Sequence, residues 1–209
     1  MDYPIIRPGK RATIAGRTGS GKTTLANWFL KRTAQHWLIL NPKHTEGYKK
    51  LPGVKTLTSF NLDKIDESLA KNQFTLLNPA PNETNPDTLD LVVRWMHETY
   101  TNVGLCCDEL YTLHDRGQPG PGLVGWLTRG RELEQSFIGL TQRPFYLSLF
   151  CFSEADYLGE MDLQLKKDRQ RFYEFTGRER SLARVRVPQW LWYDVNADTL
   201  KEYGPVPMK

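Results

Sequence analysis

Residues 16–23 constrain this sequence more than any other stretch. Their sequence, G-R-T-G-S-G-K-T, fits the pattern G-x-x-x-x-G-K-[ST], which is a phosphate-binding loop when it follows a strand and opens a helix. Residues 11–15 form a strand-like run, and residues 24–35 carry Leu25, Trp28, Phe29 and Arg32 at helical spacing. The alternative, a Gly/Ser/Thr turn at a helix start, explains fewer of these features. The stretch therefore predicts a site for nucleotide phosphates.

Each residue type in this stretch has a physical reason to be there. The glycines allow the backbone amides to close around phosphate at the positive end of a helix. Lys22 is expected to reach the β- and γ-phosphates, and the Thr23 hydroxyl is expected to bind Mg²⁺. ATP and Mg²⁺ are therefore the predicted cofactors. The predicted nucleotide-binding residues are Gly16, Arg17, Thr18, Gly19, Ser20, Gly21, Lys22, Thr23 and Thr24.

Length and composition favour a single globular domain over residues 1–209. Hydrophobic residues make up 39% of the chain and charged residues 25%, as in ordinary folded proteins. No apolar run approaches the roughly 20 residues needed to span a bilayer, and the first residues do not form an apolar secretory segment. The three cysteines, two of them adjacent, do not have the even spacing of a disulfide framework, so we expect a reducing cytoplasm.

Strand-like and helix-like stretches alternate along the chain. This alternation predicts an α/β fold with a mostly parallel central sheet and helices on both faces. We expect an extended lead-in over residues 1–10, a mobile loop over 111–125, and a C-terminal β-hairpin with its tail over 189–209. The expected strands are 11–15, 36–41, 74–77, 103–107, 136–140 and 156–163, and the expected helices are 24–35, 61–71, 89–100, 121–134, 145–152 and 166–175.

Two carboxylates follow the apolar run of residues 103–107. A buried strand that ends in Asp108 and Glu109 delivers both acids to its carboxyl end, where ligands bind in open α/β sheets. In a phosphate-loop protein, Asp108 would hold Mg²⁺ through water and Glu109 would polarise an attacking water. The alternative is an ordinary strand with a charged end. A complete phosphate loop earlier in the chain makes this alternative less favoured.

Three further side chains are candidates for the same site. Gln142 stands at the end of a predicted strand and could sense the γ-phosphate or the catalytic water. Arg129 and Arg131 lie on a predicted helix and have two open interpretations. One is an arginine that reaches a neighbouring subunit's nucleotide, since guanidinium groups suit phosphate charge. The other is a charged helix face that is simply solvated.

Residues 166–186 form the most basic part of the chain. They contain eight Lys or Arg and three Asp or Glu, whereas the whole chain has a net charge of +4. Aromatic residues lie among these cations, and this combination suits a polyanion. A solvated helix whose aromatic side chains pack inward fits equally well, so both interpretations stay open. The Trp190–Trp192 pair is interpreted as part of the core.

Taken together, these motifs resemble the FtsK/HerA superfamily of ring-shaped DNA-pumping ATPases. The most specific part is Gly130-Arg131, then a strand, then Thr141-Gln142-Arg143-Pro144. Because the resemblance covers residues 10–175 and no DNA-binding or membrane domain is added, it is nearest to the genome-packaging ATPases of tailless icosahedral viruses with an internal membrane. Leu140 stands where alanine or serine is common in the family.

The resemblance implies a role for each matching residue. Lys22 and Thr23 would hold phosphate and Mg²⁺, Asp108 the metal's water shell, Glu109 the catalytic water and Gln142 the γ-phosphate, while Arg129 or Arg131 would complete a neighbour's site. It also implies a hexameric ring with double-stranded DNA in its channel. Partners at a capsid vertex or in a membrane, and a place in the host cytoplasm and at a virion vertex, follow from the same resemblance.

The function predicted is therefore an ATP-driven translocase that packages viral DNA into a preformed capsid. Three alternatives stay open: an ATPase for phage morphogenesis or export, a small-molecule kinase that phosphorylates a nucleotide, and a scaffold that only locks its assembly with ATP. The first usually carries a membrane-spanning segment, and the second often lacks the Asp108-Glu109 pair. A scaffold would tolerate the loss of Glu109.

Overall fold

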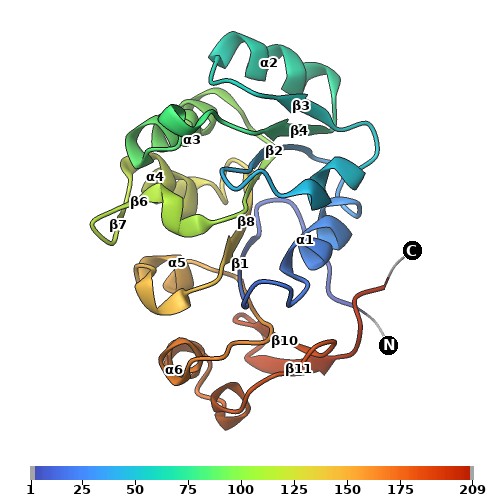
Figure 1. Cartoon of the computed structure of the whole chain (residues 1–209), viewed down its shortest axis with the longest axis vertical. Coiled ribbons are helices and arrows are strands. Elements are labelled where there is room, and N and C mark those ends of the chain that lie inside the picture. Colours follow the sequence, from blue (N-terminus) through green and yellow to red (C-terminus); the bar gives the residue numbers. More distant parts are fainter. Residues whose placement is uncertain (1–2, 208–209) are drawn as a thin grey trace.

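A nine-stranded sheet forms the centre of the molecule (Figure 1). The computed structural model describes residues 3–207. The strand order is β11-β10-β9-β1-β8-β5-β2-β4-β3, and all pairs are parallel except the two that involve β10. The strands are β1 (Arg11–Ala15), β2 (His36–Leu40), β3 (Lys55–Leu57), β4 (Phe74–Leu77), β5 (Val103–Cys107), β8 (Ser136–Thr141), β9 (Tyr157–Glu160), β10 (Trp190–Asp194) and β11 (Thr199–Tyr203). A separate small hairpin joins β6 (His114–Asp115) to β7 (Gln118–Pro119).

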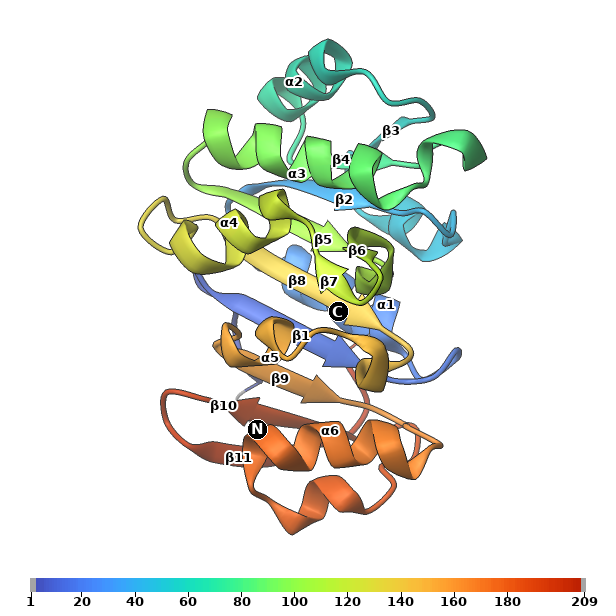
Figure 2. The same ribbon diagram turned by 90° about the vertical axis from the view of Figure 1, so that its left-hand side faces the viewer.

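Helices cover both faces of the sheet, but unequally (Figures 1 and 2). One face carries α1 (Lys22–Leu30), and the apolar sides of α2 to α6 pack on the other. The latter are α2 (Leu62–Lys71), α3 (Pro86–Thr99), α4 (Pro121–Arg129), α5 (Phe150–Ser153) and α6 (Lys166–Thr176). Short 3-10 turns are η1 (Glu46–Lys50), η2 (Pro81–Glu83), η3 (Leu110–Leu113), η4 (Pro144–Tyr146) and η5 (Glu179–Leu182).

Burial on both faces explains why the central strands are almost entirely apolar. Every residue of β1, β4, β5 and β8 is buried, as expected for parallel strands between two helical layers. Gly104 of β5 lies opposite Trp37 of β2, and a Cβ atom at position 104 would lie 2.2 Å from the indole ring. A glycine is therefore required to admit this large side chain to the core.

Local sequence signals set several helix boundaries. The side chain of Asn61 accepts a hydrogen bond from the Lys64 amide at the start of α2, and Asn85 does the same for Thr88 at the start of α3. At the other end of a helix, Gly177 follows α6 with a φ of 61°. This left-handed conformation suits glycine and ends the helix.

The fold class and the C-terminal hairpin expected from the sequence are confirmed. β10 and β11 pair in antiparallel fashion and extend the sheet beyond β9, while Trp190 and Trp192 are buried as expected. Residues 3–10, part of the expected lead-in, precede β1 and belong to no helix or strand. Residues 1, 2, 208 and 209, which also belong to the lead-in and tail, lie outside the described residues.

Several expected boundaries are wrong. The helix expected over residues 24–35 ends at Leu30, because the last turn tightens through a bond from the Arg32 amide to the Phe29 carbonyl. The helix expected over 121–134 ends at Arg129, and the chain then turns so that the amides of Leu133 and Gln135 both bind the Gly130 carbonyl. Arg131 therefore lies in a turn and not on a helix.

Other differences concern short elements. β3 was not expected, because three residues at a sheet edge carry little periodic signal. The loop expected over residues 111–125 contains the β6–β7 hairpin and the first part of α4. The helix expected over 145–152 is divided between η4 and α5, and the strand expected over 156–163 is limited to β9.

Candidate nucleotide site

The stretch from Gly16 to Thr23 connects β1 to α1, as the motif predicts. Gly19 and Gly21 have φ values of 77° and 98°, which L-residues with side chains rarely adopt. Gly16 must also lack a side chain, because a Cβ atom there would lie 2.5 Å from the Ser20 hydroxyl oxygen. The loop thus takes a shape that glycines at these positions favour.

Lys22 lies against the carbonyl groups of its own loop. Its ammonium group donates to the Gly16 carbonyl, and to the Arg17 carbonyl at 3.1 Å. Burial lowers the pKa of Lys22 to about 8, while the carboxylates of Glu109 and Asp108 oppose the shift. A cation that is partly removed from water in this way gains from an anionic ligand.

Asp108 follows β5 directly and is held by residues after β2. Its carboxylate accepts hydrogen bonds from the Thr45 hydroxyl at 2.6 Å and the Tyr48 hydroxyl at 2.8 Å. Burial raises the pKa of Asp108, and these two hydrogen bonds oppose that shift. Thr23 lies beside the same segment, since a Cβ atom on Gly47 would lie 2.8 Å from its methyl group. Thr23 therefore lies beside the segment whose Thr45 and Tyr48 side chains hold Asp108.

The predicted donor set, a hydroxyl and a carboxylate, is of the kind that Mg²⁺ uses. Residues 3–207 contain no group of three or more His, Cys, Asp or Glu side chains that could hold a metal ion. Mg²⁺ usually binds one or two protein oxygens and completes its shell with waters and substrate phosphates. The Thr23 hydroxyl would supply one such oxygen, and the Asp108 carboxylate would hold Mg²⁺ through its waters.

Glu109 is buried beside Asp108, and its side chain contacts one residue after β2 and one at the end of β8. One carboxylate oxygen pairs with the Lys43 ammonium group, and the other accepts from the Thr141 hydroxyl at 3.2 Å. Gln142 follows Thr141, and its side-chain oxygen accepts a hydrogen bond from the Thr18 hydroxyl at 2.9 Å. β8 lies between β1, which leads into the phosphate loop, and β5, which leads to Glu109. Gln142, directly after β8, therefore connects this strand to the phosphate loop through Thr18.

Lys43, Tyr48 and Asp162 are site residues that the sequence did not reveal. Asp162 follows β9; its carbonyl accepts from the Arg17 amide at 2.8 Å, and its carboxylate pairs with the Arg17 and Arg184 side chains at 2.7 and 2.6 Å. The Arg184 hydrogen bond, with help from Arg17, lowers the pKa of Asp162 to about 2. In the sequence these residues are marked only by their position after a strand. The phosphate-loop motif does not reveal which strands are neighbours in the sheet, so it could not place these residues at the site.

Arg129 and Arg131 lie away from the phosphate loop of their own chain. Arg131 donates to Asp156 at 2.9 Å, and Asp156 also binds Lys10 and Arg11 directly before β9. Arg129 ends α4, before β8 begins, and is exposed. It has no hydrogen bond or ion pair within residues 3–207. Both arginines therefore lie at the amino ends of the parallel strands, opposite the site.

The basic segment 166–186 is largely bound within the molecule. Arg169 donates to three backbone carbonyls, and Arg178, Arg180 and Arg184 pair with Asp198, Glu202 and Asp162. Arg178, Arg180 and Arg184 therefore connect this segment to the C-terminal hairpin and to the end of β9. Lys166 and Lys167, in the first turn of α6, are exposed and make no such pair within the described residues.

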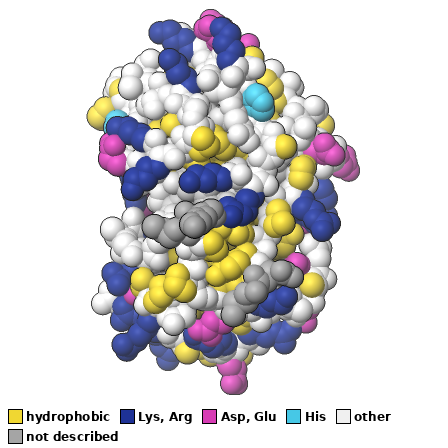
Figure 3. Space-filling view, turned by 90° about the vertical axis from the view of Figure 1, so that its right-hand side faces the viewer, with side chains coloured by type: hydrophobic (Ala, Val, Ile, Leu, Met, Phe, Trp, Pro, Cys, Tyr) yellow, Lys and Arg dark blue, Asp and Glu magenta, His cyan; other side chains and the backbone are white. Residues whose placement is uncertain are grey.

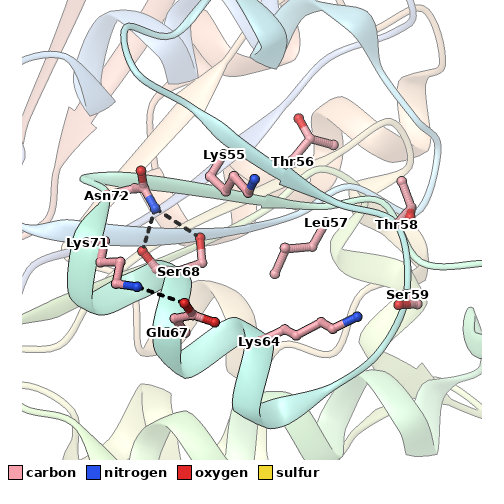
Figure 4. Close-up of a pocket in the computed structure, with 10 residues that line it drawn as sticks. All are labelled: Lys55, Thr56, Leu57, Thr58, Ser59, Lys64, Glu67, Ser68, Lys71 and Asn72. Carbon is pink, nitrogen blue, oxygen red and sulfur yellow. Dashed lines mark hydrogen bonds and ion pairs between the residues drawn. The ribbon is translucent and has the colours of Figure 1, made fainter.

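Two of the hollows in the described part of the chain adjoin elements named above. The larger, of about 540 Å³, lies between β3 and α2 and is lined by Lys55, Lys64 and Lys71 together with Ser and Thr side chains (Figure 4). A smaller one, of about 310 Å³, borders Thr23 and Thr24 and runs along α1 past Lys31. The face that carries α1 shows Lys and Arg side chains interspersed with exposed apolar ones (Figure 3).

Comparison with known proteins agrees with this geometry. The DNA packaging ATPase P9 of Enterobacteria phage PRD1 is 26% identical over 212 residues, which cover 95% of this chain and 88% of that protein. The genome packaging NTPase B204 from Sulfolobus turreted icosahedral virus 2, in complex with sulfate, aligns with a TM-score of 0.77 over 98% of this chain and all of that one, at 19% identity. The chain has the fold of a viral genome-packaging NTPase.

Other comparisons are consistent with this result. B204 in complex with ATP-gammaS gives a TM-score of 0.76 at 20% identity, covering 96% of this chain and 99% of that one. VirB4 of Thermoanaerobacter pseudethanolicus gives 0.69 at 12% identity, covering 99% of this chain and 97% of that one. No protein-family model matches the sequence. The resemblance to packaging ATPases noted in the sequence is confirmed.

Proposed function

We propose that this chain is an ATP-hydrolysing motor that moves double-stranded DNA into a viral capsid. The observation that carries the proposal is the position of Glu109, buried beside Asp108 and held between Lys43 and Thr141. A carboxylate fixed there suits the orientation of a water molecule for attack on a γ-phosphate. The relationship to the packaging ATPase of phage PRD1 supports DNA packaging as the task.

The proposed mechanism gives each residue one role. The amides of Gly16 to Thr23 and the Lys22 ammonium group bind the phosphates of ATP, and Thr23 and Asp108 hold Mg²⁺. When bound, Mg²⁺ would offset charge on the phosphate oxygens. Glu109 orients the attacking water, and Gln142, which binds Thr18 of the loop, responds to the γ-phosphate.

A neighbouring subunit would complete the site in this proposal. Arg129 is the better candidate for the arginine that acts across the interface, because Arg131 is already bound to the buried Asp156. An arginine at the amino ends of the strands can reach a nucleotide only on another subunit. We therefore propose a homo-oligomeric ring, with six subunits as in the superfamily it resembles, and double-stranded DNA in its channel.

The same reasoning proposes where the motor works. A packaging ATPase acts where DNA meets the capsid, so we propose a capsid vertex, with its capsid or membrane proteins, as the docking site, and the host cytoplasm as the place of assembly. Among residues 3–207, no helix is long and apolar enough to cross a bilayer.

ATP hydrolysis by the purified chain tests this function. We expect phosphate release that long double-stranded DNA stimulates, and we expect Glu109→Gln to reduce turnover at least about 100-fold while ATP binding persists, because only the water-orienting group is lost. Transfer of phosphate to an added nucleoside monophosphate would instead favour a kinase. Full activity in the Glu109→Gln variant would refute the role of Glu109.

A further inference from the structure

A group of exposed aromatic side chains lies directly after Gln142. Phe145 and Tyr146 have ring centroids 5.5 Å apart, and Tyr146 also contacts Tyr111, which stands at η3. All three side chains are exposed, as are those of Leu149, directly before α5, and Leu165, directly before α6. Exposed apolar side chains gathered in one place usually mark a contact surface.

Cations surround these rings. The guanidinium group of Arg143 lies 4.8 Å from the centroid of the Tyr146 ring, and Lys167 and Arg171 lie 5.3 and 5.8 Å from that of Phe145. The Nε atom of Arg171 is buried and has no hydrogen-bond partner. We call this surface the aromatic–cationic patch; it consists of Arg143, Phe145, Tyr146, Lys166, Lys167 and Arg171.

The patch is connected to the nucleotide site through one buried carboxylate. Asp168 of α6 is 2% exposed; it accepts from the Arg143 side chain at 3.1 Å and from the Phe145 amide at 3.2 Å. The segment after Gln142 is therefore clamped to the first turns of α6, which starts on the side where β8 and β9 end (Figure 2). A shift of Gln142 relative to Thr18 would thus move the rings and the α6 lysines together.

We propose that the aromatic–cationic patch binds the phosphate backbone of double-stranded DNA and couples its position to the γ-phosphate. This inference rests on the proposed function. The exposed lysines, which have no acidic partner within the described residues, suit a polyanion, and exposed tyrosines can donate hydrogen bonds to phosphate oxygens. A protein partner is the other possible occupant, and the test below distinguishes it.

Two variants and a matched control test the patch in the full chain. Lys166→Ala/Lys167→Ala removes two exposed charges, and Tyr146→Ala removes a ring that is 52% exposed, so neither change disturbs the core. Lys55→Ala/Lys64→Ala removes two lysines from the hollow between β3 and α2 (Figure 4), at the other end of the sheet. Arg143 is left unchanged because it pairs with Asp168.

We expect the double lysine variant of the patch to keep the basal ATP turnover but to bind DNA about tenfold more weakly. A plot of the logarithm of the binding constant against the logarithm of the salt concentration should become less steep by about 2, since each phosphate contact contributes about 1 to this slope. Tyr146→Ala should weaken DNA binding and its stimulation of turnover. The Lys55→Ala/Lys64→Ala control should behave like the unchanged protein.

Three results would overturn the inference. In the first, the patch variants bind DNA like the unchanged protein. In the second, the Lys55→Ala/Lys64→Ala control loses DNA binding instead. In the third, the patch variants bind DNA but no longer self-assemble, which would assign the patch to a contact with a second copy of the chain. If the unchanged protein neither binds DNA nor responds to it, the proposed function fails as well. The behaviour of the unchanged protein therefore separates the two failures.

Discussion

Glu160 stands out at the scale of single residues, because it is an acid with no evident part in the proposed chemistry. It lies at the end of β9, its side chain is 1% exposed, and neither carboxylate oxygen has a hydrogen-bond partner. Burial raises the pKa of Glu160 to about 8, while Ser181, Arg180 and Arg169 oppose the shift only in part. At neutral pH this carboxyl group is therefore mostly protonated.

The raised pKa predicts how stability depends on pH. Between about pH 4.5 and pH 8 the folded state holds a proton that the unfolded state releases, so this group lowers the free energy of unfolding as pH rises through that range. Glu160→Gln cannot ionise and should be more stable than the unchanged protein by roughly 4 kcal/mol at pH 8, with little difference at pH 4.5. Thermal unfolding of both proteins at the two pH values measures this. An equal difference at both values would contradict it.

At the scale of elements, the end of α4 distinguishes the two candidate arginines. Arg131→Ala removes one of three cations from the buried Asp156, and we expect a loss of about 1 kcal/mol in stability, because Arg131 is half exposed and Lys10 and Arg11 remain. Burial alone would raise the pKa of Asp156, but the hydrogen bonds from Lys10 and Arg11 outweigh it and lower that pKa. We therefore expect Arg131 to have a structural role.

Arg129→Ala should leave stability unchanged and lower the ATP turnover of the assembled protein by about 1,000-fold, as for other arginines that act across an interface. The two variants serve as controls for each other, since they lie two residues apart. Turnover at a protein concentration that supports assembly, together with the melting temperature, decides between them. A larger loss of turnover in Arg131→Ala would reverse the assignment.

The sequence was sufficient where an element depends on consecutive residues. The phosphate loop, the strand that ends in Asp108-Glu109 and the strand that ends in Thr141-Gln142 all occur where their local patterns predicted. Lys43, Tyr48 and Asp162 could not be predicted, because their contacts depend on which strands are neighbours. The basic segment was ambiguous for the same reason: its arginines bind carboxylates that are distant in sequence, such as Glu202.

At the scale of the whole molecule, the proposed functional parts lie at the two opposite ends of the parallel strands. The phosphate loop, Glu109, Gln142 and the aromatic–cationic patch follow the carboxyl ends of the parallel strands, whereas Arg129 lies at their amino ends. A contact that brings Arg129 to a neighbour's nucleotide must join different surfaces of the two copies. Such head-to-tail contacts close into a ring if the rotation allows, which is the assembly that the proposed function needs.

Movement of DNA is the central claim, and displacement of a third strand from a triplex at the end of a long duplex measures it most directly. We predict that the assembled protein releases the third strand in the presence of ATP, and that the Glu109→Gln variant, which should bind both ATP and DNA, does not. Hydrolysis of ATP on DNA without release of the third strand would contradict the translocase account.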